Sequence, residues 1–189
     1  MIRYPIPLLG FSAWSGTGKT TLLRRLLLLL KEQGLTLGVI KHAHHSFDID
    51  LPGKDSYELR QAGADQVLVV SRRRMALIRE MRETQQEPEL EEVLTHLDPD
   101  GLDLLLVEGY KHAAFPKIEL HRQALGKPVL YPQDPYIVAV ASDVPLQTSL
   151  PNLDLNQPSE VADFVTRLIA QHRKTGHADL HHLHHTKLR

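Results

Sequence analysis

The chain has 189 residues, of which 42% are hydrophobic and 24% charged, which is enough apolar material for one compact domain and excludes disorder throughout. The 22 basic side chains nearly balance the 23 acidic ones, so a formal net charge of −1 gives no global electrostatic basis for binding nucleic acid or an anionic membrane. The chain has no cysteine, which excludes disulfides, thiolate metal sites and a cysteine nucleophile, and the expected location is the cytoplasm.

Short apolar runs alternate with segments of helical composition along the chain. Strands are expected at 8–13, 35–40, 67–70, 102–107 and 137–141, and helices at 19–33, 54–61, 89–97 and 158–172. Residues 75–79 are expected to form a hairpin with 67–70, and residues 117–120 an edge strand. Strands without polar alternation are typical of a sheet that is covered on both faces. The prediction is therefore an α/β fold with a mostly parallel sheet flanked by helices on both faces.

No stretch reaches the roughly 18 apolar residues that a membrane helix needs, so no membrane span is expected. The domain is predicted to cover residues 1–172. Residues 173–189 form a polar, His-rich tail whose imidazoles could chelate nickel or zinc opportunistically.

A phosphate-binding loop is predicted where the first strand meets the first helix, in the sequence AWSGTGKTT at residues 13–21. Glycines allow successive backbone N–H groups to converge on an anion, the lysine supplies a positive charge, and the hydroxyl after it ligates Mg²⁺. Ala13 stands where the usual pattern has its first glycine, so this position must adopt an ordinary backbone conformation. The nucleotide-binding residues predicted in this loop are Ser15, Gly16, Thr17, Gly18, Lys19, Thr20 and Thr21.

A second acidic corner of the site is expected at Glu108, where the buried run DLLLVEG ends, and Gly109 would let the backbone turn away beside the phosphates. Lys19 and Glu108 are the predicted catalytic groups. The polar loop at 41–56 is a candidate switch or partner segment through His42, His44, His45, Asp48, Asp50 and Lys54. Thr20, Glu108 and Asp48 are the predicted metal ligands.

Asp143 follows the last buried strand, at the sheet edge where ligands of open α/β sheets bind. A carboxylate there can accept hydrogen bonds from the N1–H and the exocyclic amine of guanine, which adenine does not offer. The sequence therefore favours GTP over ATP, with a helix or turn cap as the alternative role for Asp143.

Four blocks of the sequence together resemble the molybdopterin-guanine dinucleotide biosynthesis adaptor protein B (MobB) family: AWSGTGKTTLL at 13–23, KHAHHSFDIDLPGKDSYELRQAGA at 41–64, LDLLLVEGYKH at 102–112 and IVAVASDVPL at 137–146. The second block is the most diagnostic, because other P-loop proteins share only the first. The resemblance covers about residues 6–170 and does not include the tail. It implies a P-loop NTPase-type fold, binding of GTP with Mg²⁺, weak GTP hydrolysis and a homodimer. It also implies a guanylyltransferase partner of the MobA type, which joins GMP to molybdopterin, with molybdopterin itself as a further candidate partner.

Two alternatives remain open at this stage. The first is a P-loop small-molecule kinase in which Arg72, Arg73 and Arg74 clamp a phosphate, although the chain has no long insertion for a lid. The second is a nickel or zinc metallochaperone GTPase, although no cysteine pair supports it and the histidines cluster in the tail.

Overall fold

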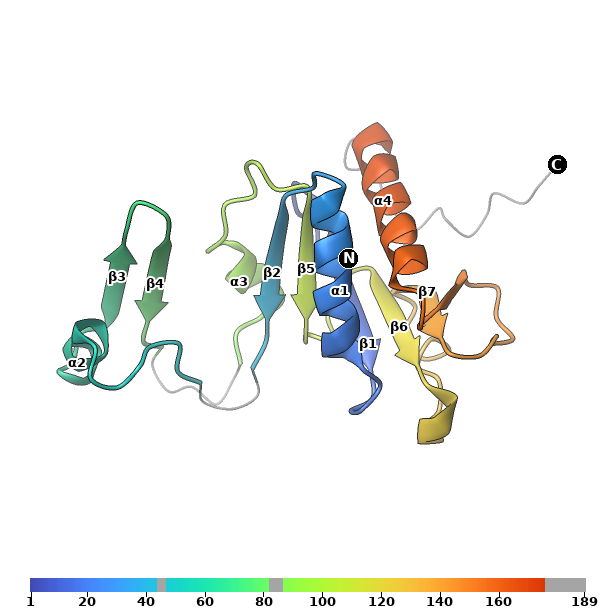
Figure 1. The fold of residues 1–189 in the computed structure, drawn as a ribbon, viewed down its shortest axis with the longest axis horizontal. Helices are drawn as coiled ribbons and strands as arrows, with labels where there is room; N and C mark the ends of the chain where they lie inside the picture. Colours follow the sequence, from blue (N-terminus) through green and yellow to red (C-terminus); the bar gives the residue numbers. More distant parts are fainter. Residues whose placement is uncertain (44–46, 82–86, 176–189) are drawn as a thin grey trace. The chain divides into compact units, whose positions relative to one another are not determined.

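The computed structural model describes residues 1–43, 47–81 and 87–175 and contains a six-stranded sheet and a separate hairpin. The elements follow in the order β1 (Leu8–Ala13), α1 (Lys19–Glu32), β2 (Leu37–Lys41), α2 (Asp55–Gln61), β3 (Gln66–Val70), β4 (Met75–Arg79), α3 (Leu90–Leu94), β5 (Leu104–Glu108), β6 (Lys117–His121), η1 (Gln123–Leu125, a 3₁₀ turn), β7 (Ile137–Ser142), β8 (Asn152–Asp154) and α4 (Pro158–Thr175). The six-stranded sheet has the order β2-β5-β1-β6-β7-β8, and every neighbouring pair is parallel (Figure 1).

The chain divides into two compact units, Met1–His42 with Leu90–Arg189, and Ala43–Glu89. The first unit holds the large sheet with α1, α3 and α4. The second holds α2 and the antiparallel hairpin of β3 and β4, which confirms the hairpin expected from the sequence. The sequence alone did not indicate this division.

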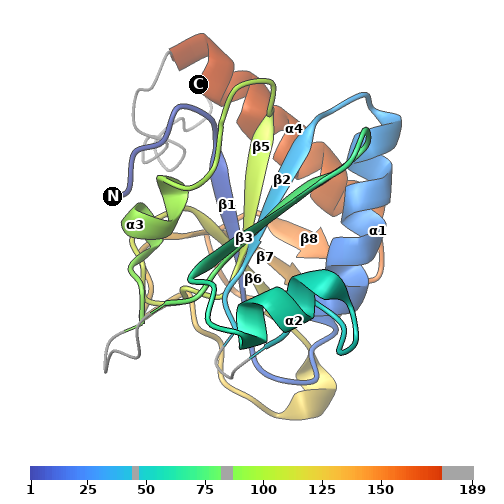
Figure 2. The same cartoon turned by 90° about the vertical axis from the view of Figure 1, so that its left-hand side faces the viewer.

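Helices cover both faces of the large sheet, as predicted (Figure 2). One face packs against α1 and α4, because alternate residues of β1 such as Leu9 and Phe11 meet a stripe of buried leucines on α1 that includes Leu26 and Leu30. The opposite face carries Leu8 and packs with α3. This layered arrangement brings the carboxyl ends of all six parallel strands to one edge of the sheet.

The prediction that residues 117–120 form an edge strand was wrong. The strand exists as β6, but it lies between β1 and β7, while β2 and β8 form the two edges. Polar and apolar residues alternate along this strand, yet Lys117 and Glu119 are both buried. Residues of the loops on either side of β6 supply partners for both charges.

The predicted helix boundaries differ modestly from those in the structure. The helix expected over 89–97 spans only Leu90–Leu94, and the closing helix extends to Thr175. The short strand β8 was not predicted. None of the helices in the described ranges is long and apolar enough to cross a membrane.

Candidate functional site

The loop between β1 and α1 closes on itself through Thr17. Its backbone N–H and its Oγ1 both donate to the carbonyl oxygen of Trp14, at 3.3 and 2.7 Å, and only 2% of Thr17 is exposed. Gly16 and Gly18 adopt positive φ angles of 84° and 97°, which side chains disfavour. The glycines of the predicted phosphate loop are therefore required by its backbone conformation.

The helix α1 begins at Lys19 directly after this loop. Gly18 is its N-cap and supplies no side-chain hydrogen bond to the first turn. The first N–H groups of the helix consequently remain available to a ligand, at the end of the helix where the backbone dipole favours negative charge. This is the arrangement that binds phosphate in other proteins.

A pocket of about 540 Å³ is lined by residues 13–21, and these include every residue that the sequence assigned to the phosphate loop. Its volume is within the range of small-molecule sites. Ala13 ends β1 and has no positive φ, as its side chain requires. Thr20 and Thr21 are exposed on the first turn of α1.

Glu108 is brought beside Lys19 of this loop by the pairing of β1 with β5, in which Phe11 lies opposite Glu108. The Nζ of Lys19 lies 3.8 Å from Oε1 of Glu108, and the two side chains are 28% and 19% exposed. This distance is longer than that of a close charged hydrogen bond, so both groups retain capacity for a further partner. The structure thus brings Lys19, Thr20 and Glu108 to one edge of the sheet.

Gly109 turns the chain after β5 with a φ of 102°, and a Cβ at this position would lie 2.5 Å from the Cβ of His42. The backbone N–H of His42 donates to the carbonyl of Glu108, and the His42 ring stacks on Tyr110 at a centroid distance of 4.4 Å. Tyr110 itself has a positive φ of 51°. The end of β2 is therefore held tightly against the turn that follows Glu108.

The rest of the predicted switch segment belongs to the second unit. Arg60 forms ion pairs with Asp48 and Glu80, and its hydrogen bond with Asp48 holds the pKa of that carboxyl below its usual range. Oδ1 of Asp50 accepts hydrogen bonds from Ser56 Oγ and the Leu51 N–H.

The structure does not test the roles predicted for the other residues of the switch segment at 41–56. Lys54 is exposed at the start of α2, and His44 and His45 lie outside the described residues. The metal-binding role of Asp48 stays a prediction. Across the part of the chain that the structure describes, no group of three or more His, Asp or Glu side chains is arranged to hold a metal ion.

Asp143 follows β7, and its carboxylate already has two partners. Oδ1 accepts the backbone N–H of Gln123 at 2.9 Å, and Oδ2 lies 3.5 Å from Nη1 of Arg122. Arg122 also donates from Nε to the carbonyl of Thr17 at 3.4 Å. Sequence reasoning missed Arg122, because no local motif marks it and only the order of the strands brings it to the loop.

Two buried charges of β6 anchor the loops beside the site. The Nζ of Lys117 donates to the carbonyls of Lys111 and Ala113 and pairs with Asp134 at 2.9 Å. Glu119 accepts the N–H groups of Leu130 and Tyr131, each at 2.8 Å. Burial raises the pKa of the Glu119 carboxyl, and these two hydrogen bonds oppose that rise.

Comparison with known proteins places these features in one family. The sequence profile of the family described as "Molybdopterin guanine dinucleotide synthesis protein B" (MobB) matches residues 8–143, which include the loop, Glu108 and Asp143. The chain is 50% identical to the molybdopterin-guanine dinucleotide biosynthesis adapter protein of Escherichia coli (strain K12), over 85% of this chain and 91% of the relative. It is 42% identical to the protein of the same name from Haemophilus influenzae, over 85% and 88% of the two chains.

Solved structures are similar as well. A crystal structure of molybdopterin-guanine biosynthesis protein B aligns with a TM-score of 0.67 at 25% identity, covering 86% of this chain and 99% of that one. A crystal structure of MobB from Bacillus subtilis aligns with a TM-score of 0.62 at 28% identity, covering 86% and 97% of the two chains. The similarity therefore extends over the fold as well as the motifs.

Proposed function

The chain belongs to the molybdopterin guanine dinucleotide synthesis protein B family, and on that premise we propose that it is an adapter in molybdopterin-guanine dinucleotide biosynthesis that acts by binding GTP with Mg²⁺. The names of its relatives support the adapter role. The observation that carries the nucleotide part is the loop itself, in which Gly16 and Gly18 adopt positive φ angles directly before Lys19 and a helix N-terminus without a side-chain cap.

The phosphates of the nucleotide would bind the backbone N–H groups of residues 15–20 and the ammonium of Lys19. The oxygens of Thr20 and Glu108 suit Mg²⁺, which prefers hard oxygen ligands and keeps several waters. Lys19 and Glu108 lie 3.8 Å apart, so they partly neutralise each other before any ligand binds. When both ligands bind, the anionic triphosphate would pair with Lys19 and the cation would pair with Glu108, in place of their present interaction with each other.

The guanine base would bind at Asp143 beyond the end of β7. An ionised carboxylate has about four lone-pair sites, so its contacts with Gln123 and Arg122 leave further acceptor capacity. Two neighbouring donors, the N1–H and the exocyclic amine, would distinguish guanine from adenine, which presents an acceptor at N1. Selectivity for GTP is thus expected to depend on the charge of Asp143.

We further propose that the GTP-loaded protein acts as a homodimer that serves a MobA-type guanylyltransferase, and that its own hydrolysis of GTP is slow. One face of the hairpin supports dimerisation, because Leu68, Val70, Met75 and Leu77 share that face and each is 54–71% exposed. An isolated two-stranded hairpin is marginally stable in water. A second copy of this chain is the expected cover for this face.

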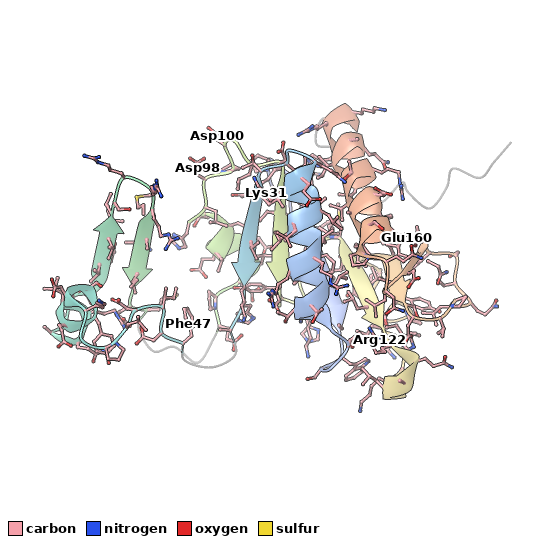
Figure 3. The ribbon with its side chains drawn as sticks, in the orientation of Figure 1. Lys31, Phe47, Asp98, Asp100, Arg122 and Glu160 are labelled. Atoms are coloured by element: carbon pink, nitrogen blue, oxygen red, sulfur yellow. The ribbon has the colours of Figure 1, made fainter. Side chains whose placement is uncertain are left out.

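The proposal is tested by titrating the purified protein with GTP, ATP and GDP in the presence of Mg²⁺. Lys19→Ala should weaken GTP binding at least about tenfold, because it removes a charge-assisted contact with the phosphates. Lys31→Ala, at the other end of the same helix and exposed, is the matched control and should bind as the unmodified protein does (Figure 3). Unchanged GTP affinity in Lys19→Ala would show that the phosphate site is wrongly assigned.

The remaining parts of the proposal have their own readouts. Equal affinities for GTP and ATP would contradict the guanine assignment, and a phosphorylated small-molecule product would favour the kinase alternative. Leu77→Glu should convert a dimer into a monomer in sedimentation or size-exclusion measurements, because it places a charge in the apolar face. Binding of the guanylyltransferase should be stronger for the GTP-loaded protein than for the protein without nucleotide.

A further inference from the structure

The three adjacent strands β1, β6 and β7 end at the same edge of the sheet, and one side chain connects the segments that follow them. Arg122 lies immediately after β6 and contacts both the phosphate loop after β1 and Asp143 after β7 (Figure 3). We propose that Arg122 is a positioning residue that orients the phosphate loop and the base-reading carboxylate together. This inference rests on the proposed function and adds to it a residue that sets both affinity and base selectivity.

The contact with the phosphate loop is a hydrogen bond from Nε of Arg122 to the carbonyl oxygen of Thr17, at 3.4 Å. The peptide unit is planar and trans, so its N–H points opposite to its C=O. Fixing the Thr17 carbonyl toward the guanidinium therefore fixes the N–H of Gly18 away from it. Gly18 lines the pocket and has a φ of 97°, so its peptide lacks the restraint that a side chain would give.

The contact with Asp143 uses another nitrogen of the same planar group. Nη1 of Arg122 lies 3.5 Å from Oδ2, while the N–H of Gln123 holds Oδ1. The carboxylate is therefore oriented by two successive residues of the same chain segment. A rigid guanidinium can keep two such contacts in fixed relation, whereas the ammonium of lysine is a single point charge.

The segment at 122–128 also contacts the phosphate loop through Trp14 and lies close to Gly16. Nε1 of Trp14 donates to the carbonyl of Pro128 at 2.8 Å, and the Leu125 side chain approaches within 3.8 Å of the position that a Cβ on Gly16 would occupy. Nζ of Lys127 lies 5.7 Å from the centre of the Trp14 ring. The loop is thus held along its length by one segment, and Arg122 is the member of that segment that also reaches Asp143.

Trp14 gives the inference a direct readout. It is the only tryptophan of the chain, it is 40% exposed, and it lies in the phosphate loop. Its emission should change when a ligand alters the contact between the loop and segment 122–128. Binding of a phosphate ligand can therefore be followed by intrinsic fluorescence and checked by calorimetry.

The experiment compares inorganic triphosphate, GTP and ATP, each with Mg²⁺, on the full chain and its variants. Arg122→Ala should bind inorganic triphosphate about five- to tenfold more weakly, the effect of one hydrogen bond of ordinary strength. It should also lower the ratio of GTP affinity to ATP affinity. Asp143→Asn should lower that ratio more than it lowers the affinity for inorganic triphosphate, because it weakens only the Asp143 side of the Arg122 contacts. Arg167→Ala, an exposed arginine on α4, is the control and should alter neither quantity.

Arg122→Lys separates the two contacts and covers the case in which the alanine variant does not fold. It should keep part of the preference for GTP, because a positive charge remains near Asp143, but not the full affinity for triphosphate. If both Arg122 variants match the unmodified protein in triphosphate affinity and in the GTP to ATP ratio, the inference is overturned while the proposed function stands. If the unmodified protein binds no triphosphate, both fail. If it binds GTP and ATP equally, the guanine assignment fails. The part of the inference that concerns Asp143 then fails too, while the part that concerns the phosphate loop is still tested by triphosphate affinity.

Discussion

Replacing Gly109 by alanine should destabilise the protein through two separable effects. The first is the backbone conformation, because a φ of 102° costs an L side chain about 1 to 2 kcal/mol. The second is steric, because the new Cβ would lie 2.5 Å from the Cβ of His42, and ordinary contact starts at 3.4 Å. His42 would have to move, and its stacking on Tyr110 would be lost, at about 0.5 to 1.5 kcal/mol. The expected total loss is about 1.5 to 3.5 kcal/mol.

Gly34→Ala is the matched control for this prediction. Gly34 has a similar φ of 80°, yet no atom lies within 4 Å of the position of its added Cβ. Only the conformational cost of about 1 to 2 kcal/mol applies there. Urea unfolding followed by circular dichroism gives both free energies of unfolding. The dependence of the free energy on urea concentration should have the same slope in both variants. Equal losses in the two variants would refute the reasoning that the contact between Gly109 and His42 is tight.

Three further predictions concern charged side chains. Lys117→Met should lower the free energy of unfolding by about 3 to 5 kcal/mol, measured in urea, because it leaves the partly buried Asp134 without its cation. The raised pKa of Glu119 means that its contribution to stability is fully present below the usual value near 4.5 and is lost as pH rises through the folded-state pKa. Unfolding measured across this range should therefore show the unmodified protein losing stability relative to Glu119→Gln as pH increases, and parallel curves would contradict the assignment. Arg60→Ala should return the lowered pKa of Asp48 toward its usual value. NMR titration of the Asp48 side-chain carboxyl measures this pKa, and a value that stays as low as in the unmodified protein would contradict the prediction. The stability that this pair gives is present above the usual Asp pKa and is lost as pH falls through the lowered one.

The local parts of the site could be predicted from the sequence, because their chemistry is encoded in consecutive residues. The phosphate loop is an example, because the positive φ angles at Gly16 and Gly18 and the positive charge of Lys19 can be inferred from the residue types alone. Glu108 could be predicted as well, since a carboxylate that ends an apolar strand must emerge at the sheet edge. The hairpin of β3 and β4 followed from two short apolar runs separated by a polar turn.

Features that depend on strand order could not be predicted in this way. Arg122 lies 105 residues after Thr17, and they meet only because β6 is inserted beside β1. The same insertion explains the wrong prediction of an edge strand. The alternation of charged and apolar residues in β6 assigns them to two different faces of the strand, but it does not indicate what covers each face. Partners for Lys117 and Glu119 come from the loops on both sides of β6, and nothing in the strand itself indicates them.

The position of the second unit within the chain has a consequence for folding. It is inserted between β2 and α3, so the parallel pairing of β2 with β5 joins segments separated by the whole of Ala43–Glu89. Closing a flexible loop of that length costs about 3 kcal/mol in chain entropy, beyond a constant term. Prior formation of the local β3–β4 hairpin shortens the flexible part of this loop and lowers that cost. Residues of the second unit thereby influence the rate at which Lys41 and Glu108, which are paired in the folded sheet, come together.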